Sequence, residues 1–339
     1  MRLRRRLPIF FGVLLIAAAV TAAIQLRKHA PPESARLLPG ADGFVYLNLK
    51  WVRRTGVLGK LAAVHHEADY QQFIQNTGFE FERDLDQAAF AVHYPTAANG
   101  IPKTELRFSE VFVGRIDGSK LRDYLLRLSA KVENYNSIEI YSIPLDGRTL
   151  RVAILGVGLV AASNYPDPLL IRGVIDRSRK LASPFGGPAF LRRYFKEVPI
   201  ASLGWAVFNT DPGNPAMPQN LSFLLTKPAV LVASVRYLGS VHLRAEAFTA
   251  NDEEARQLRE RAEAFLNIFH SAEDSAAQGT DPDVKAFFNG LKVEQHRNRA
   301  VLTAILPAAF LQKAISEPAS EAPNTSQLEP HRDLTPSRQ

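Results

Sequence analysis

The apolar residues of this chain form one long uninterrupted run, followed by many short periodic segments. The run covers residues 7–26 (LPIFFGVLLIAAAVTAAIQL) and contains no charge, with only Thr21 and Gln25 as clearly polar residues. As a helix with roughly 1.5 Å of rise per residue it would be about 30 Å long, which matches the hydrocarbon core of a bilayer. The pattern therefore predicts a transmembrane helix near the N-terminus.

Basic residues flank this run unequally. Arg2, Arg4, Arg5 and Arg6 precede it, whereas only the pair at positions 27 and 28 follows it. The more positive flank of a membrane span stays in the cytoplasm. The asymmetry therefore predicts a single-pass protein of the cytoplasmic (inner) membrane, with residues 29–339 on the extracytoplasmic side.

A cleaved secretory signal is the alternative interpretation of the same run. A basic start, an apolar core and small residues near Ala19 or Ala23 would fit cleavage, and the domain would then be secreted or periplasmic. The apolar run continues to Leu26 and ends at a basic pair, which favours an uncleaved anchor. The triplet at positions 4–6 matches a twin-arginine signal only weakly. Both main interpretations export the domain.

The net charge and the absence of cysteine exclude several classes of function for this protein. The formal net charge is +7, from 41 basic and 34 acidic residues. Residues 1–28 hold six of the basic residues and no acid, which leaves 35 against 34, a net charge of +1 for the rest. The basicity thus sets membrane topology and predicts no nucleic-acid partner. The chain has no cysteine, which excludes disulfides, thiol catalysis and cysteine-ligated metals.

The exported part begins with a Pro-containing segment, residues 29–36, that we interpret as a linker. Strands are then predicted at 44–49, 88–94, 106–116, 138–143, 149–155 and 159–163. Helices are predicted at 52–64, 69–76, from the cap at 117–119 to Val132, and after Asp167-Pro168. A Pro- and Gly-rich break at 183–188 suggests a boundary.

The second part repeats this order in outline. Strands are predicted at 202–209, 230–237, 241–248, 291–295 and 300–306. Asn251 with Glu254 three residues later is typical of a capping box, and opens a long helix. Short helices are predicted at Phe287-Phe288 and from Pro307.

These patterns predict an α+β fold, with mainly antiparallel sheets in two similar halves that follow the transmembrane helix. The predicted organisation is an anchor at 1–28, a linker at 29–36, halves at 37–183 and 184–317, and a polar tail at 318–339. The tail contains almost no apolar residue and is expected to be disordered. We interpret the two halves as a tandem duplication; the alternative is two unrelated α+β stretches.

Residues 156–161 (GVGLVA) match the spacing of a dinucleotide-binding fingerprint. That mechanism needs a helix directly after the glycines, so that its N-terminus faces the pyrophosphate. Here a strand is predicted at 159–163, and Asn164-Tyr165-Pro166 ends it. A hairpin that uses glycine for positive φ explains the same residues, so no cofactor is expected.

His65 and His66, beside Glu67 and Asp69, form the polar cluster closest to metal-binding chemistry. Adjacent residues on a helix point about 100° apart, so the two histidines would not easily share one ion. His66 and Tyr70, or His65 and Asp69, are spaced to share a face. We interpret the cluster as a solvated helix end and predict no metal site.

Catalytic motifs give no candidate residue. No serine lies in a G-x-S-x-G or S-x-x-K setting. Carboxylate pairs such as Asp84 with Asp86, or Glu253 with Glu254, fall where turns and helix starts explain them. Residues 77–86 lack the spaced oxygen ligands and internal glycine of a calcium loop. A site assembled from distant residues stays open, and the catalytic residues of any such site are unknown.

Three segments carry a resemblance to known sequences: LPGADGFVYLNL from Leu38, TGFEFERDLD from Thr77, and VFVGRIDGSKLRDYL from Val111. Together they resemble uncharacterised bacterial envelope proteins that have an N-terminal anchor and an α+β ectodomain. The resemblance covers about residues 37–182. It implies location and fold, and it brings no assigned activity or site residue.

The sequence therefore favours a non-enzymatic binding or scaffold module of the bacterial envelope. The membrane is its first partner, through residues 7–26, and an envelope protein, a lipid or the cell wall is the expected second partner. An exported hydrolase with a dispersed active site is the alternative function. A ligand-binding sensor is a third interpretation, although no cytoplasmic signalling domain is predicted. A deep polar pocket would indicate an enzyme, whereas an exposed apolar surface would indicate a binding module.

Overall fold

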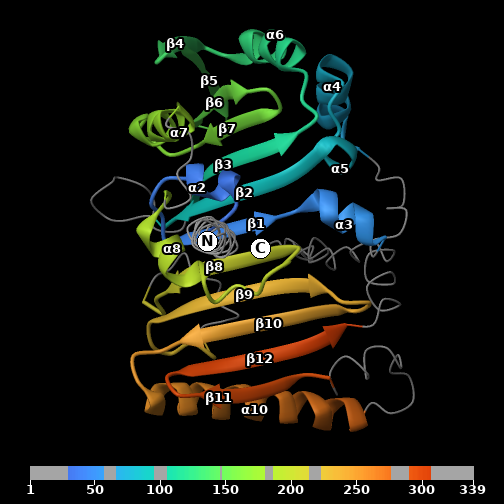
Figure 1. Ribbon diagram of the computed structural model, residues 1–339, viewed down its shortest axis with the longest axis vertical. Coiled ribbons are helices and arrows are strands. Elements are labelled where there is room, and N and C mark those ends of the chain that lie inside the picture. Colours follow the sequence, from blue (N-terminus) through green and yellow to red (C-terminus); the bar gives the residue numbers. More distant parts are fainter. Residues whose placement is uncertain are drawn as a thin grey trace, which may run out of the picture.

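The computed structural model describes residues 30–56, 66–94, 105–145, 147–179, 186–213, 223–275 and 290–306. Twelve strands form one antiparallel sheet in the order β11-β12-β10-β9-β8-β1-β2-β3-β7-β6-β5-β4. In Figure 1 they are stacked along the long axis, with β4 toward one end and β11, beside α10, at the other.

The strands are β1 (Gly43–Leu47), β2 (Leu85–His93), β3 (Arg107–Gly114), β4 (Lys131–Tyr135), β5 (Ile138–Leu145), β6 (Arg148–Gly156), β7 (Leu159–Ser163), β8 (Gly204–Thr210), β9 (Ala229–Tyr237), β10 (Val241–Phe248), β11 (Lys292–His296) and β12 (Arg299–Leu306). The helices are α2 (Glu33–Leu37), α3 (Leu49–Thr55), α4 (Ala68–Thr77), α5 (Phe81–Asp84), α6 (Gly118–Leu128), α7 (Leu169–Arg179), α8 (Ala189–Phe195) and α10 (Asp252–Ser275).

Helices pack on both faces of the sheet. The first face carries α2, α7 and α8, whose Leu37, Ile171 and Leu191 belong to the largest buried cluster. The second face carries α4 and α6 toward the β4 end of the sheet, with α6 over β5 and β6, and α10 over the β11 end. Because successive strand residues point to opposite faces, each strand contributes side chains to two separate apolar layers. Figure 1 shows α6 and α10 near opposite ends of the sheet.

The sheet is continuous because β1 pairs with β8. Tyr46 lies opposite Trp205, and their rings stack with centroids 5.5 Å apart on the first face. Gly43 lies opposite Phe208, where a Cβ on the glycine would overlap the Phe208 ring. The absence of a side chain at Gly43 therefore makes room for Phe208 at the joint.

The predicted α+β class is confirmed, and most of the described elements match their predicted positions. The segments predicted at 230–237 and 241–248 form β9 and β10, which pair over their whole length. The capping box also forms, since the Asn251 side chain accepts from the Glu254 N–H at 2.9 Å. Strong periodicity and a local cap were sufficient signals for these elements.

Three predictions need correction. The expectation of separate sheets is wrong, because one sheet runs through both halves. The helix predicted to reach Val132 ends at Leu128, since Ser129 is extended and Val132 pairs with Tyr141 in β4. The predicted linker at 29–36 contains most of α2, whose Ala35 is fully buried on the first face.

Other predictions fall outside the described residues. These are the anchor at 7–26, much of the helix at 52–64, the helices at 287–288 and from 307, and the tail at 318–339. Among the helices that the structure describes, none has the length and apolarity needed to span a membrane. The anchor therefore stays a prediction.

The GVGLVA segment forms a β-hairpin, as predicted, since β6 and β7 flank it. Gly158 has φ +64°, and a Cβ there would lie 2.3 Å from the carbonyl oxygen of Gly114. Gly156 has neither constraint. The second glycine is thus required by the turn and by its contact with β3, with no need for a bound nucleotide.

We expect Gly158→Ala to lower the free energy of unfolding by about 1–3 kcal/mol or more, because it adds backbone strain and a clash with Gly114. Gly156→Ala is the matched control and should change stability much less. Urea denaturation followed by circular dichroism measures both. Equal tolerance at the two positions would contradict this account of the turn.

Candidate functional site

An apolar pocket of about 400 Å³ lies on the second face, between the sheet and the helices α4 and α6. Its floor comes from β3, β5, β6 and β7, and its roof comes from α4, α5 and α6. The lining residues are Phe73, Thr77, Phe79, Phe81, Glu110, Phe112, Ile116, Asp117, Leu121, Tyr124, Leu125, Leu128, Ile143, Leu145, Leu150, Val152, Val160 and Ala162. Its size falls within the range of about 300–1,000 Å³ that is usual for ligand sites.

Aromatic side chains build the wall beneath α4. The Phe73 ring stacks on Phe81 with centroids 5.7 Å apart, and meets Tyr124 of α6 edge-on at 5.5 Å. Tyr70 fixes this wall, because its hydroxyl group accepts from the Phe81 N–H at 2.8 Å and donates to Glu82 at 2.6 Å. Burial and the bond to Glu82 raise the pKa of Tyr70 to about 12, so the hydroxyl stays a donor.

The rim of the pocket is apolar and exposed. Phe81 is 38% exposed, Leu128 44% and Leu145 53%. Single exposed apolar residues are ordinary, but here all three line the same pocket. An apolar ligand would therefore meet compatible surface as it enters.

Glu110 of β3 is the exception in this apolar setting. It lies directly between Phe90 of β2 and Ala162 of β7, and it lines the pocket floor. No hydrogen bond or ion pair reaches its carboxyl group from any residue that the structure describes. Burial alone raises the pKa of Glu110 to about 7, because a charge in apolar surroundings loses its hydration.

Two other polar residues of the lining, Thr77 and Asp117, already make hydrogen bonds within the protein. The Thr77 hydroxyl group donates to the Phe73 carbonyl at 2.8 Å. The Asp117 carboxylate accepts from the backbone N–H groups of Ser119 and Lys120 as the cap of α6. Of the three, Glu110 is therefore the group available to a ligand.

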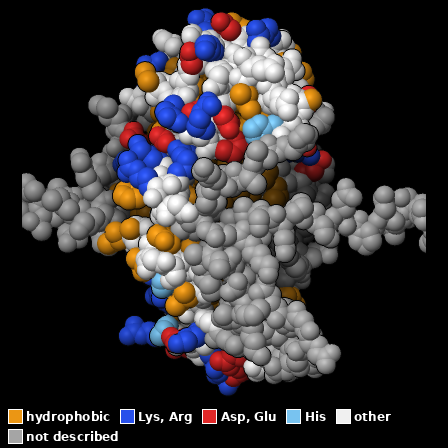
Figure 2. All heavy atoms as spheres, turned by 90° about the vertical axis from the view of Figure 1, so that its right-hand side faces the viewer, with side chains coloured by type: hydrophobic (Ala, Val, Ile, Leu, Met, Phe, Trp, Pro, Cys, Tyr) orange, Lys and Arg blue, Asp and Glu red, His pale blue; other side chains and the backbone are white. Residues whose placement is uncertain are grey.

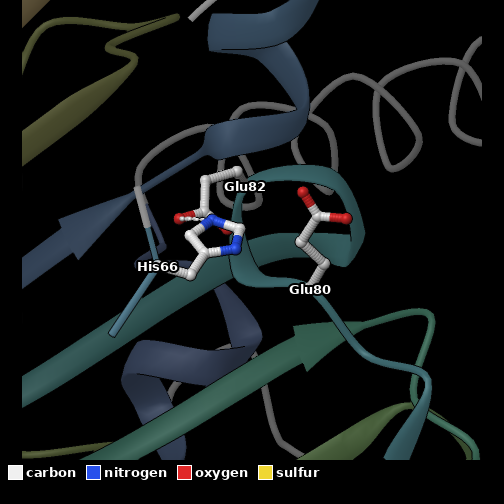
Figure 3. A group of neighbouring side chains, drawn as sticks. All are labelled: His66, Glu80 and Glu82. Atoms are coloured by element: carbon white, nitrogen blue, oxygen red, sulfur yellow. Dashed lines mark ion pairs between the residues drawn. The ribbon is translucent and has the colours of Figure 1, made fainter. Parts of the chain in front are cut away.

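The structure places the histidine cluster differently from the prediction. His66 lies beside Glu80 and Glu82 (Figure 3), and one ligand atom from each of the three falls within 4.8 Å of the others. Its ring also meets Tyr70 edge-on, as their spacing predicted. His65 is outside the described residues.

The carboxylates of this cluster already have protein partners. Glu80 pairs with Arg83 at 3.0 Å, and Glu82 accepts from Tyr70 and lies 3.8 Å from His66. These contacts tie α5 to the start of α4 and account for the group without a cation. The expectation of no metal site stays a prediction.

The surface near this cluster is mixed in charge. Figure 2 shows basic and acidic side chains next to each other over the upper part of this side. Ion pairs such as Arg53 with Asp86 at 2.7 Å and Arg115 with Asp84 at 2.9 Å contribute to that pattern. Such a surface does not form a single basic patch on this side, and the absence of a nucleic-acid partner stays a prediction.

A serine–histidine contact bears on the alternative function, an exported hydrolase. His93 Nε2 lies 3.1 Å from Ser109 Oγ, which lies 3.0 Å from Ser163 Oγ. Ser109 is fully buried and His93 nearly so, and neither lines the apolar pocket. Burial lowers the pKa of His93 to about 4. We interpret this chain of hydrogen bonds as part of the sheet's interior, since a nucleophile must be reachable by substrate.

The pocket and Glu110 were not predicted from the sequence. A signal was present, because Phe108, Glu110 and Phe112 share one face of a strand, and that face is otherwise aromatic in this segment. The pocket exists because α6 lies at a distance from the sheet. No residue pattern within a single segment of the sequence indicates that distance.

Comparisons with known proteins give distant structural likeness only. The chain matches no protein-family model and no curated protein. Crystal form I of TP0453 aligns at a TM-score of 0.45 with 10% identity, covering 84% of this chain and 96% of that one. Crystal form III gives 0.44 and 11%, covering 84% and 98%, and form IV gives 0.40 and 11%, covering 85% and 97%. Likeness at this level transfers no function, and the resemblance to uncharacterised envelope proteins stays a prediction.

We expect Glu110→Gln to stabilise the protein increasingly as the pH rises from about 4.5 to above 7. The folded protein holds the Glu110 proton more tightly than the unfolded chain, so wild-type stability is lost over this interval. A pKa change from 4.5 to about 7 corresponds to on the order of 3 kcal/mol at pH 8. The difference between variant and wild type in urea denaturation isolates Glu110, because His93 titrates in both. A difference that does not vary with pH would contradict the assignment.

Proposed function

We propose that this chain is a membrane-anchored, extracytoplasmic binding module of the bacterial envelope, and that its pocket takes an apolar ligand or the apolar part of one. The observation that carries the proposal is the pocket itself, a space of about 400 Å³ lined almost entirely by aromatic and aliphatic side chains. Burying apolar ligand surface there would contribute roughly 25 cal/mol per Å² before the costs of binding. Of the two acidic residues in the lining, Glu110 and Asp117, Glu110 alone has no partner among the described residues, which favours binding over catalysis.

The anchor is the second part of the proposal. The apolar run at 7–26 and its unequal basic flanks support an inner-membrane span with the domain outside the cytoplasm. A ligand-binding domain held at the membrane surface would meet membrane-derived apolar molecules at high local concentration. An envelope protein or the cell wall stays a further possible partner of the same module.

We also infer a tandem duplication, with halves at 37–183 and 184–317. Outward from the β1–β8 joint, one half has the order β1, β2, β3, β7, β6, β5, β4 and the other β8, β9, β10, β12, β11, so the first five strands of each half correspond and β5 and β4 are additional. The joint is locally symmetric: the Asn48 N–H donates to the Leu203 carbonyl at 2.7 Å, and the Asn209 N–H to the Asp42 carbonyl at 2.8 Å. This correspondence gives an internal control for the pocket.

The second half supports a specific role for the pocket. The corresponding helix α10 places Ala255 and Leu258 against the sheet, and the pocket that Leu258 lines together with Ala229 is only about 20 Å³. The same arrangement of strands and helix can therefore be closely packed. The larger space under α6 is a property of the first half and not a necessity of the fold.

The anchor predicts that nearly all of the full-length protein stays in the membrane pellet after alkaline carbonate extraction. The control is the same chain with residues 1–28 replaced by a cleavable signal peptide, which should appear in the soluble periplasmic fraction. A soluble full-length product that begins near Ala19 or Ala23 would establish the cleaved signal instead.

The pocket predicts that Ala162→Phe will reduce binding of an apolar probe, because the ring would occupy the floor between β3 and β6. Full-length protein in phosphatidylcholine nanodiscs would be labelled with a diazirine-bearing long-chain alcohol, and labelled peptides identified by mass spectrometry. We expect labelling of the segments around Phe73 and Leu125 to fall at least five-fold.

Val157→Phe is the matched control, because Val157 is fully exposed at the tip of the β6–β7 hairpin. It adds the same aromatic surface outside the pocket and should leave labelling unchanged. Wild-type labelling confined to residues 7–26, or no effect of Ala162→Phe in a protein of unchanged melting temperature, would overturn the proposed function.

A further inference from the structure

The position of Glu110 is unusual across the whole sheet. Directly paired residues of neighbouring strands share a face, so the pairings define a row that crosses all twelve strands on the second face. From β4 to β11 the row is Val132, Tyr141, Val152, Ala162, Glu110, Phe90, Val45, Ala206, Ala233, Ala245, Leu302 and Val293. Glu110 is the single charged residue in it.

The fold does not need a carboxyl group at this place. In the second half the equivalent position, third outward from the joint, is Ala245 of β10, and its outer neighbour is Leu302. An apolar residue in the row is therefore compatible with the same strand pairing. A half-buried carboxyl group among apolar neighbours and without a described partner costs stability, so Glu110 is better explained by an interaction with something outside the described structure.

We propose that the pocket is specific for an amphiphile whose alkyl chain lies against the aromatic wall and whose protonated amine pairs with Glu110. This inference rests on the proposed function and deepens it. An amine is the complement that a carboxylate in apolar surroundings lacks, since it supplies both the opposite charge and up to three hydrogen-bond donors. A neutral alcohol would supply one donor, and a carboxylate head would be repelled by ionised Glu110.

The surroundings of Glu110 do not compete with this pairing. From β2 and β7 it faces Phe90 and Ala162, and from its own strand Phe108 and Phe112 share its face. The roof helices contribute two titratable residues to the lining, Asp117 and Tyr124 of the α6 segment. Asp117 caps α6, which lowers its pKa, and the Tyr124 ring carries the Arg127 guanidinium at 5.8 Å. No cation of the described lining residues reaches Glu110.

The test compares three diazirine-bearing probes of equal chain length, an alkyl amine, an alkyl alcohol and an alkyl carboxylate. Full-length protein in phosphatidylcholine nanodiscs is photolabelled at pH 8, where an alkyl amine with a pKa near that of lysine, about 10.4, stays protonated. We expect the amine to label the pocket at least ten-fold more strongly than the carboxylate, with the alcohol between them. In Glu110→Gln this ratio should fall at least ten-fold.

Asp117→Ser is the matched control. It removes the other carboxylate of the lining but keeps an oxygen that can cap α6, so it should retain the preference for the amine. Lysophosphatidylethanolamine as a competitor distinguishes two sources of the amine. If it displaces the alkyl amine probe, the ligand is assigned as an amine-headed membrane lipid. If it does not displace the probe, the ligand is assigned as a free alkyl amine.

Other outcomes separate this inference from the proposed function. Equal labelling by all three probes, unchanged in Glu110→Gln but lost in Ala162→Phe, would overturn the amine preference and leave an unselective apolar site. If the preference for the amine were lost in Asp117→Ser and kept in Glu110→Gln, then Asp117 would be the carboxylate that pairs with the amine. That result would also overturn the inference. No pocket labelling by any probe would overturn both.

Discussion

The pairing of β1 with β8 is the interaction on which the rest of the structure depends. These strands are more than 150 residues apart in the chain, yet each lies at the centre of the sheet with its neighbours extending outward. The joint is tolerant of large side chains because each of its ends places a glycine opposite one, Gly43 with Phe208 and Gly204 with Leu47. A side chain at Gly43 would clash with the Phe208 ring and separate the strands, and the sheet would then lose its common first-face core.

That common core explains why the second face is free to vary. The first face is filled across the joint, where Phe44, Trp205 and Val207 meet the helices α2 and α8 in one buried cluster. The second face is covered by separate groups of helices with separate small clusters. A helix there can therefore stand off from the sheet without opening the main core. The pocket under α6 and the dense packing under α10 are two outcomes of the same freedom.

Features of the fold that depend on neighbouring residues could be predicted from the sequence, whereas features made by contacts between distant segments could not. Alternation over 230–237 and 241–248 and the Asn251 cap are local, and they identified strands and a helix start correctly. Val132 was misplaced because its spacing from Leu128 suits a helix, while its pairing with Tyr141 is a contact that spacing does not encode. The β1–β8 joint and the pocket are likewise made by distant segments. The one local sign of the site was a glutamate between two phenylalanines on an apolar strand face.

Glu110 connects the packing of the sheet with the proposed binding. Its carboxyl group costs stability where it stands, since it lies among aromatic and aliphatic neighbours without a partner, and the equivalent Ala245 avoids that cost. The same surroundings that disfavour the charge would strengthen its attraction to an amine, because a low local dielectric enlarges both the penalty of an unpaired charge and the gain from pairing it. The stability that the Glu110 charge costs and the selectivity that it would give for an amine therefore have a single physical origin. A ligand with the opposite charge would remove the penalty as it binds, and an uncharged chain of the same length would leave it in place.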